Sequence, residues 1–175
     1  LKVGHAGTLD PLATGLRIVC TGRMTKQIDN FQAQEKVYTG TMLLGQTTPS
    51  YDLESEPDAF FPTDGNTEEM MEEARKSFIG DIMQRPPKFS AIKIQGKRAF
   101  EYARSDEEVA LKERLVHIED FKLDTSNFPT VNFEVKCSKG TYIRSLVNDF
   151  GKALNSGACM TSLRRTKIGE FSVEN

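Results

Sequence analysis

A single carboxylate, Asp10, stands in a short segment that is rich in glycine and contains one proline. The segment reads Gly4-His5-Ala6-Gly7-Thr8-Leu9-Asp10-Pro11-Leu12-Ala13-Thr14-Gly15. Glycines permit backbone angles that other residues resist, and Pro11 fixes its own φ while it pushes Asp10 out of the helical region. A carboxylate aimed by a stiff loop suits covalent or acid–base catalysis. An isolated Asp-Pro pair usually only starts a turn, but this segment departs from a generic turn along its whole length.

The residues that follow this segment predict the strand that holds it in place. Residues 16–20 form a short, mostly apolar run between Gly15 and Gly22, which is typical of a buried strand. We therefore expect Asp10 on a rigid loop beside the core.

Apolar spacing along the rest of the chain predicts helices and strands without a regular βαβ rhythm. We expect helices at 24–34, from Thr67 to Gly80 and at 141–155, with one or two helical turns at 99–104. We expect a loop at 46–66 and strands at 36–44, 89–95, 115–124 and 130–137, with one or two short strands after residue 158. This mixture predicts an α+β fold, with a largely antiparallel mixed sheet and flanking helices.

Charge is distributed unevenly along the chain, although its net value is only −2. A net negative charge argues against a nucleic-acid binder, since phosphate contacts need clustered Lys and Arg. Acidic residues, however, gather in 50–81, whereas 85–104 and 136–168 are basic. Solvated surface charge explains each basic run taken alone. The opposed acidic block favours a polarised molecule with one RNA-facing side.

The three cysteines, Cys20, Cys137 and Cys159, are widely spaced and form no C-x-x-C pair. This pattern predicts neither a zinc site nor a disulfide framework, and Cys20 and Cys137 are expected in the core. There is no signal-peptide pattern and no apolar stretch approaching 18 residues. We therefore expect a cytoplasmic protein with no membrane partner.

Five further motifs follow the Asp10 segment in order. They are Lys36-Val37-Tyr38, Leu44-Gly45-Gln46-Thr47-Thr48 with Tyr51-Asp52, Ser90-Ala91-Ile92-Lys93-Ile94-Gln95-Gly96-Lys97, Cys137-Ser138-Lys139-Gly140-Thr141-Tyr142-Ile143-Arg144, and Leu163-Arg164-Arg165. Together with the first segment, this set resembles the TruB-type tRNA pseudouridine synthases. A lone Gly-Thr-Tyr-Ile-Arg would be a weak signal, but the motifs are in register over nearly the whole chain.

The resemblance implies that the chain isomerises a specific uridine in the T loop of tRNA to pseudouridine, as a monomer and without a cofactor or metal. Such a reaction breaks the N-glycosidic bond, turns the base over and rejoins it through carbon, in a pocket that excludes water. Asp10 corresponds to the essential aspartate of the family. The sequence leaves open whether it attacks the sugar or the base, or mainly assists elimination and proton removal.

The resemblance also implies roles for residues around Asp10. Tyr38 corresponds to the ring that stacks on the target base, and Arg144 to the arginine that pairs with the aspartate and keeps it ionised. Tyr142 and Leu163 match positions that line the base pocket. Plainer interpretations stay open: a half-buried strand tyrosine for Tyr38, a phosphate contact or surface charge for Arg144, and a core side chain for Leu163.

Other polar residues match the family less specifically. The resemblance places His5 against the RNA loop, where it would pack on and hydrogen-bond unstacked bases. Four more residues are expected to contact RNA or support the site, with a plain surface charge as the alternative for each: Lys26, Asp52, Lys93 and Lys97.

Residues 87–115 align with an inserted segment that closes over the RNA loop in this family, which gives the basic run at 85–104 a purpose. Two usual family features do not appear: a strand and Lys-Pro-x-Gly-x-Ser/Thr segment before the histidine motif, and a C-terminal RNA-binding domain of the PUA type. The first residue is Leu1. We therefore expect residues 1–175 to form an N-terminally shortened catalytic domain with weakened tRNA affinity.

Two other classes of function stay open on sequence alone. One is an RNA-binding or tRNA-folding module without turnover. The other is a nucleoside or glycoside hydrolase that uses Asp10, which fits less well because no second carboxylate lies in a matching motif.

Overall fold

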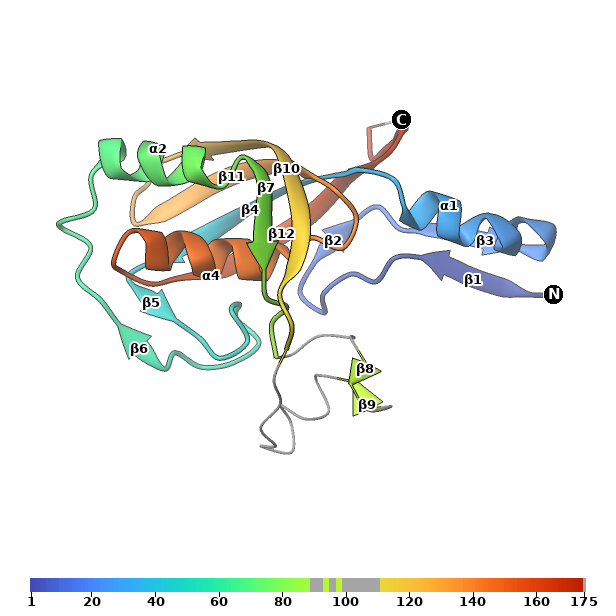
Figure 1. Cartoon of the computed structure of the whole chain (residues 1–175), viewed down its shortest axis with the longest axis horizontal. Helices are drawn as coiled ribbons and strands as arrows, with labels where there is room; N and C mark the ends of the chain where they lie inside the picture. Colours follow the sequence, from blue (N-terminus) through green and yellow to red (C-terminus); the bar gives the residue numbers. More distant parts are fainter. Residues whose placement is uncertain (89–92, 95–96, 99–110, 175) are drawn as a thin grey trace.

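The computed structural model of the chain describes residues 1–88, 93–94, 97–98 and 111–174. Its main feature is a seven-stranded sheet (Figure 1). The strands follow the order β13 (Phe171–Ser172), β12 (Ala158–Ile168), β4 (Lys36–Leu44), β11 (Thr130–Cys137), β10 (Arg114–Asp124) and β7 (Gly80–Gln84). Neighbours in this order pair antiparallel, and β2 (Thr14–Gly15) pairs in parallel with β12. The predicted α+β class with a largely antiparallel mixed sheet is confirmed.

One face of the sheet carries the core. Along β11, buried residues alternate with exposed ones, as expected for a strand with one face on the core and one in water. Helices α2 (Glu68–Ser77) and α4 (Ile143–Ala153) cover the buried face (Figure 1). Phe150 of α4 packs edge-on against Phe121 of β10, with ring centroids 5.9 Å apart.

The two long helices form where their sequences predict. The Thr67 hydroxyl caps α2 by accepting the Met70 N–H at 3.2 Å. Helix α4 approaches the start of β12 closely at Gly151, where a Cβ would lie 2.4 Å from the Ala158 nitrogen. No helix among the described residues is long and apolar enough to cross a membrane.

The N-terminal residues build a separate two-stranded unit. Strands β1 (Val3–Ala6) and β3 (Ile18–Thr21) pair antiparallel and lead into a 3-10 helix, η1 (Gly22–Gln27), and α1 (Ile28–Gln32). The expected strand at 16–20 exists with shifted bounds, but its predicted burial is wrong, because Val19 is 58% exposed and only Cys20 of β3 is buried. All three cysteines are free and buried, which confirms the core prediction for Cys20 and Cys137.

The sequence also missed several short elements. Strands β5 (Gln46–Thr47) and β6 (Ala59–Phe60) pair inside the predicted loop. Strand β7 begins at Gly80, where only a helix end was expected, whereas the strand expected in the tail is present as β12 and is longer than predicted. Strand β8 (Lys93–Ile94) pairs with β9 (Lys97–Arg98), while the rest of the strand predicted at 89–95 and the turns predicted at 99–104 lie outside the described residues.

Candidate active site

The loop that carries Asp10 is docked on β12 along its second half. Thr14 and Gly15 lie opposite Arg164 and Arg165, and the Leu16 N–H donates to the Arg165 carbonyl at 2.8 Å. Gly15 has a φ of +104°, and a Cβ there would lie 2.2 Å from the Arg165 carbonyl oxygen. Only glycine fits such a backbone at that distance. The loop is therefore held against the sheet through its main chain.

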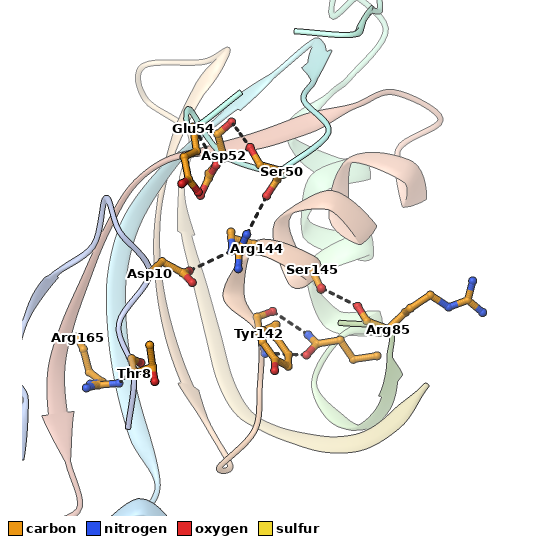
Figure 2. Close-up of polar contacts among 11 residues, drawn as sticks. Thr8, Asp10, Ser50, Asp52, Glu54, Arg85, Tyr142, Arg144, Ser145 and Arg165 are labelled. Atoms are coloured by element: carbon orange, nitrogen blue, oxygen red, sulfur yellow. Dashed lines mark hydrogen bonds and ion pairs between the residues drawn. The ribbon is translucent and has the colours of Figure 1, made fainter. Parts of the chain in front are cut away.

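Asp10 lies against the side chain of Arg144, which comes from the first turn of α4 (Figure 2). The Arg144 Nε–H donates to Asp10 Oδ2 at 3.1 Å, and Nη1 donates to the Ser50 carbonyl at 3.2 Å. The Arg144 side chain is 3% exposed and that of Asp10 is 25% exposed. The structure thus brings together the two residues whose pairing the resemblance implies.

The pKa of Asp10 is raised above its ordinary value. Burial is the largest cause, and the nearby Asp52 adds to it; Arg144 and, more weakly, Arg165 act in the opposite direction. Arg144 was expected to keep Asp10 ionised, and its guanidinium does favour the charged form. Desolvation is nevertheless the larger influence on this carboxyl group. Asp10 therefore combines the basicity of a desolvated carboxylate with a fixed cationic partner.

Asp52 is a buried residue of the loop behind Arg144, so the surface alternative for it is wrong. It is 1% exposed. Its Oδ1 accepts the Ser50 hydroxyl at 2.6 Å and the Glu54 N–H at 2.9 Å, whereas its Oδ2 has no hydrogen-bond partner among the described residues. These bonds shape the turn that presents the Ser50 carbonyl to Arg144 (Figure 2). Asp52 thereby supports the position of the arginine.

Asp10 and Arg144 open onto a cavity of about 960 Å³. Tyr38, Tyr142 and Leu163, the other predicted pocket residues, also line it. Tyr38 is 8% exposed, and burial raises the pKa of its phenol. Five residues predicted from four separate motifs therefore converge on one space that is large enough for a nucleotide.

The remaining predicted site residues lie elsewhere. His5 is an exposed residue of β1 opposite Val19, and Lys26 is exposed on η1; neither lines the cavity. Lys93 and Lys97 belong to β8 and β9, and their side chains lie outside the described residues. Within the described part of the chain, no cluster of three or more His, Cys, Asp or Glu side chains could hold a metal ion.

Two buried polar residues at the site were missed from the sequence. Arg165 is 2% exposed and reaches the Asp10 loop. Gln84 is also 2% exposed and holds the main chain of Tyr142 from both sides, accepting its N–H at 2.7 Å and donating to its carbonyl at 2.9 Å. Strand parity is a signal for the first, because Arg165 stands two residues after the pocket residue Leu163 and so shares its face.

Family models cover the whole chain. Residues 1–143 match the TruB family pseudouridylate synthase N-terminal domain, and residues 144–175 match the tRNA pseudouridylate synthase B C-terminal domain. The boundary between the two models falls inside the site, since Asp10 lies in the first and Arg144 opens the second.

Curated relatives match at high identity. The chain is 56% identical over 174 residues to tRNA pseudouridine synthase B of Parabacteroides distasonis, covering 99% of this chain and 74% of that protein. It is 55% identical over 174 residues to the protein of the same name from Flavobacterium johnsoniae, covering 99% of this chain and 76% of that protein.

Solved structures of more distant proteins share the fold. A chain of a Cbf5-Nop10-Gar1 complex matches with a TM-score of 0.71 and 29% identity, over 99% of this chain and 42% of that chain. An H/ACA RNP bound to a substrate RNA containing 2'-deoxyuridine matches with a TM-score of 0.68 and 26% identity, over 99% of this chain and 40% of that chain.

Proposed function

The chain belongs to the TruB family of pseudouridylate synthases and isomerises uridine to pseudouridine in tRNA, and we propose that its target is a uridine of the T loop and that Asp10 is the catalytic residue. The relatives named tRNA pseudouridine synthase B support tRNA as the substrate. The motif set around Asp10 supports the T loop as the location of the target.

The reaction moves one bond of the base and one proton. The C1'–N1 bond breaks, the base turns over, a C1'–C5 bond forms, the C5 proton leaves, and N1 gains a proton. Covalent attachment of the carboxylate of Asp10, or its action as a base, makes the bond cleavage or proton removal easier. The cavity around Tyr38 and Leu163 would keep the detached base from water while it turns.

The observation that carries this proposal is the Asp10–Arg144 pair at the wall of the cavity. Arg144 opposes the effect of burial, so the pKa of the Asp10 carboxyl group rises less than burial alone would raise it. A carboxylate with a raised pKa in a cavity is also the kind of group that functional sites contain.

Product analysis tests the proposed function against its alternatives. The chain is incubated with a tRNA transcript, the RNA is digested to nucleosides, and these are separated by chromatography and their masses measured by mass spectrometry. An isomer of uridine with unchanged mass at a T-loop position supports the proposal. Binding without conversion would favour a tRNA-folding module, and release of free uracil would identify a hydrolase.

A stacking role for Tyr38 predicts different effects for two substitutions. The target base must leave its stack to reach Asp10, and an aromatic ring compensates part of that loss. Tyr38→Leu should weaken transition-state binding by about 1–3 kcal/mol, measured as kcat/KM on tRNA, because base–aromatic stacking is of that size. Tyr38→Phe keeps the ring and should retain most activity. Equal losses in both variants would assign the role to the hydroxyl group.

We also propose that the basic segments 85–104 and 136–168 form one RNA face. Strands β7 and β10 pair directly, with Gln84 opposite Arg114, so residues 85–113 connect two strands that are neighbours in the sheet. That arrangement supports an insertion at about 87–115 within a single catalytic domain. We further propose that the enzyme acts as a monomer. The cytoplasm, where bacterial tRNA is found, is its proposed location.

This RNA face predicts how binding responds to salt. Lys93→Ala with Lys97→Ala should flatten the dependence of log Kd on log salt, because each lost phosphate contact lowers the slope by roughly 0.7–0.9. The matched control replaces Glu69 and Glu73, two exposed acidic residues of α2, by Ala. Filter binding of tRNA at several salt concentrations measures both slopes. A similar change in both pairs would mean that the RNA face is misplaced.

A further inference from the structure

Arg165 is a buried cation at the base of the Asp10 loop. Among the described residues it is the largest of the fully buried side chains, with 2% exposure. No Asp or Glu carboxylate of the described residues forms an ion pair with it. A buried charge without a carboxylate partner is expensive, and an apolar side chain of similar volume often stabilises a fold as well or better. The stability of the sheet alone therefore does not account for an arginine at this position.

The guanidinium group of Arg165 bonds to both ends of the loop. Its Nε–H donates to the Leu16 carbonyl at 2.9 Å, Nη1 donates to the Thr8 carbonyl at 3.2 Å, and Nη2 lies 3.4 Å from the Gly7 carbonyl. Gly7 and Thr8 precede Asp10, whereas Leu16 follows it. The planar fork of one arginine thus closes the neck of the loop, which a single ammonium group is too compact to do.

The main chain of Arg165 holds only the second half of the loop, whereas its side chain bonds to both halves. The Arg165 carbonyl accepts the Leu16 N–H, and β12 pairs with Thr14 and Gly15 of β2. The backbone of β12 therefore fixes the second half of the loop. The first half, before Asp10, is reached by the side chain alone. Arg165 also lies opposite Tyr38 across β12 and β4, and a hydrogen bond from its guanidinium lowers the pKa of the Tyr38 phenol against the effect of burial.

We propose that Arg165 is a positioning residue for the isomerisation, which closes the Asp10 loop through the carbonyls of Gly7, Thr8 and Leu16 and sets the carboxylate against Arg144 and Tyr38. This role rests on the proposed function of Asp10. It is distinct from that of Arg144, which contacts the carboxylate itself.

Two substitutions separate positioning from plain stability. Arg165→Lys keeps a charge but loses the fork, and Arg165→Met removes both. Misplacement of a reacting group by about 1 Å reduces rates by roughly 100-fold. We therefore expect kcat on tRNA to fall by roughly 10- to 100-fold in Arg165→Lys and further in Arg165→Met, with Kd for tRNA changed less than about threefold, since a slower bound complex is what misplacement produces. Arg17→Lys, an exposed arginine just after the loop, is the matched control and should keep the original kcat.

The pH profile adds a readout that a merely structural role would not move. The charge of Arg165 lowers the pKa of Asp10, so Arg165→Met should shift the acid limb of kcat to higher pH, whereas Arg165→Lys should leave it near its original position. Unchanged kcat in folded Arg165→Met would overturn the proposal. Failure of both variants to fold would assign Arg165 to stability and overturn it as well.

Hydrogen exchange of the chain without RNA distinguishes failure of this proposal from failure of the proposed function. Amides of residues 7–16 should exchange faster in both Arg165 variants, while those of β11 stay protected. If the loop exchanges faster in the variants but the original chain converts no uridine, the positioning role of Arg165 stands and the proposed function is refuted. Normal loop exchange in an active chain would refute the positioning.

Discussion

Asp10→Asn is expected to abolish the formation of pseudouridine while tRNA binding and the fold persist. The amide keeps the size and the turn geometry, but it loses the negative charge that attacks or accepts a proton. Removal of a covalent or base group lowers kcat by roughly 10⁴-fold or more in well-studied enzymes. Release of tritium from C5-labelled uridine in tRNA measures the rate directly, because C5 loses its proton in every turnover.

The same variant should be at least as stable as the original chain at pH 7. The pKa of Asp10 is raised in the folded state, so the folded protein holds a proton at this site more tightly than the unfolded chain does. The stabilisation from the protonated form is complete below the unfolded-state pKa and is lost as pH rises through the folded-state pKa. Asn stays neutral throughout, so its thermal midpoint should not fall at pH 7. Thermal unfolding of both proteins between pH 4 and pH 8 checks this sign.

Two results would contradict a central role for Asp10. Turnover by Asp10→Asn above a trace of the original rate would remove the carboxylate from the chemistry. A thermal midpoint well below that of the original chain at pH 7 would mean that lost activity reflects lost folding. Loss of turnover without loss of stability would show that the Asp10 carboxylate serves catalysis and not folding. Such an outcome is expected at functional sites, where catalytic groups commonly lower the stability of the fold.

The long elements and the site carboxylate were predictable because local signals determine them. Helix α2 has a capping threonine and an apolar stripe, and β11 alternates with period two, so both could be located from spacing alone. Asp10 stood out because Pro11 restricts the backbone beside it, while the surrounding glycines permit backbone angles that other residues resist. Alternation over residues 36–44 likewise placed Tyr38 in a strand.

Elements made by pairing at a distance were not predictable from spacing. Strand β2 has two residues and exists only because Arg164 and Arg165 lie beside it. Residues 16–20 look like a core strand, but among the described residues the part from Ile18 onward pairs with β1 alone, and so the outer side of Val19 meets water. Gln84 carries no local sign that both atoms of its amide bond to Tyr142, because those contacts depend on where α4 begins.

The sequence predicted which charged residues pair at the site, but not whether burial or the cation has the larger effect on the pKa of Asp10. The motif resemblance paired Arg144 with Asp10, and the geometry agrees. How strongly burial raises the pKa of Asp10 depends on the whole cavity wall, which no single motif describes. The buried position of Asp52 likewise follows from the turn around Ser50 rather than from its own residue type.

The second large effect is expected for Arg144→Gln. Gln retains a donor for Asp10 but no charge, so the chief influence that lowers the pKa of Asp10 is removed while burial and Asp52 remain. The pKa of Asp10 should rise further, and the acid limb of the kcat profile should move to higher pH. At pH 7 we expect kcat to fall by roughly 10²–10³-fold, the scale seen when one fixed electrostatic partner is removed from an active site. Arg144→Lys keeps the charge and should shift the limb less.

Stability provides an independent check of this pair. Arg144→Gln leaves the Asp10 carboxylate, whose charged form burial already disfavours, without its main cation, and loss of one partner from a buried ion pair costs about 3–5 kcal/mol. Arg144→Gln should therefore lower the free energy of unfolding at pH 7, and the loss should be smaller when Asp10 is already Asn. Urea unfolding of the two single variants and the double variant gives their coupling energy. The losses of unfolding free energy in the two single variants could instead be additive, with the acid limb of kcat unchanged. Arg144 would then act on the Ser50 turn or another neighbour, and Asp10 would work without the charge of Arg144.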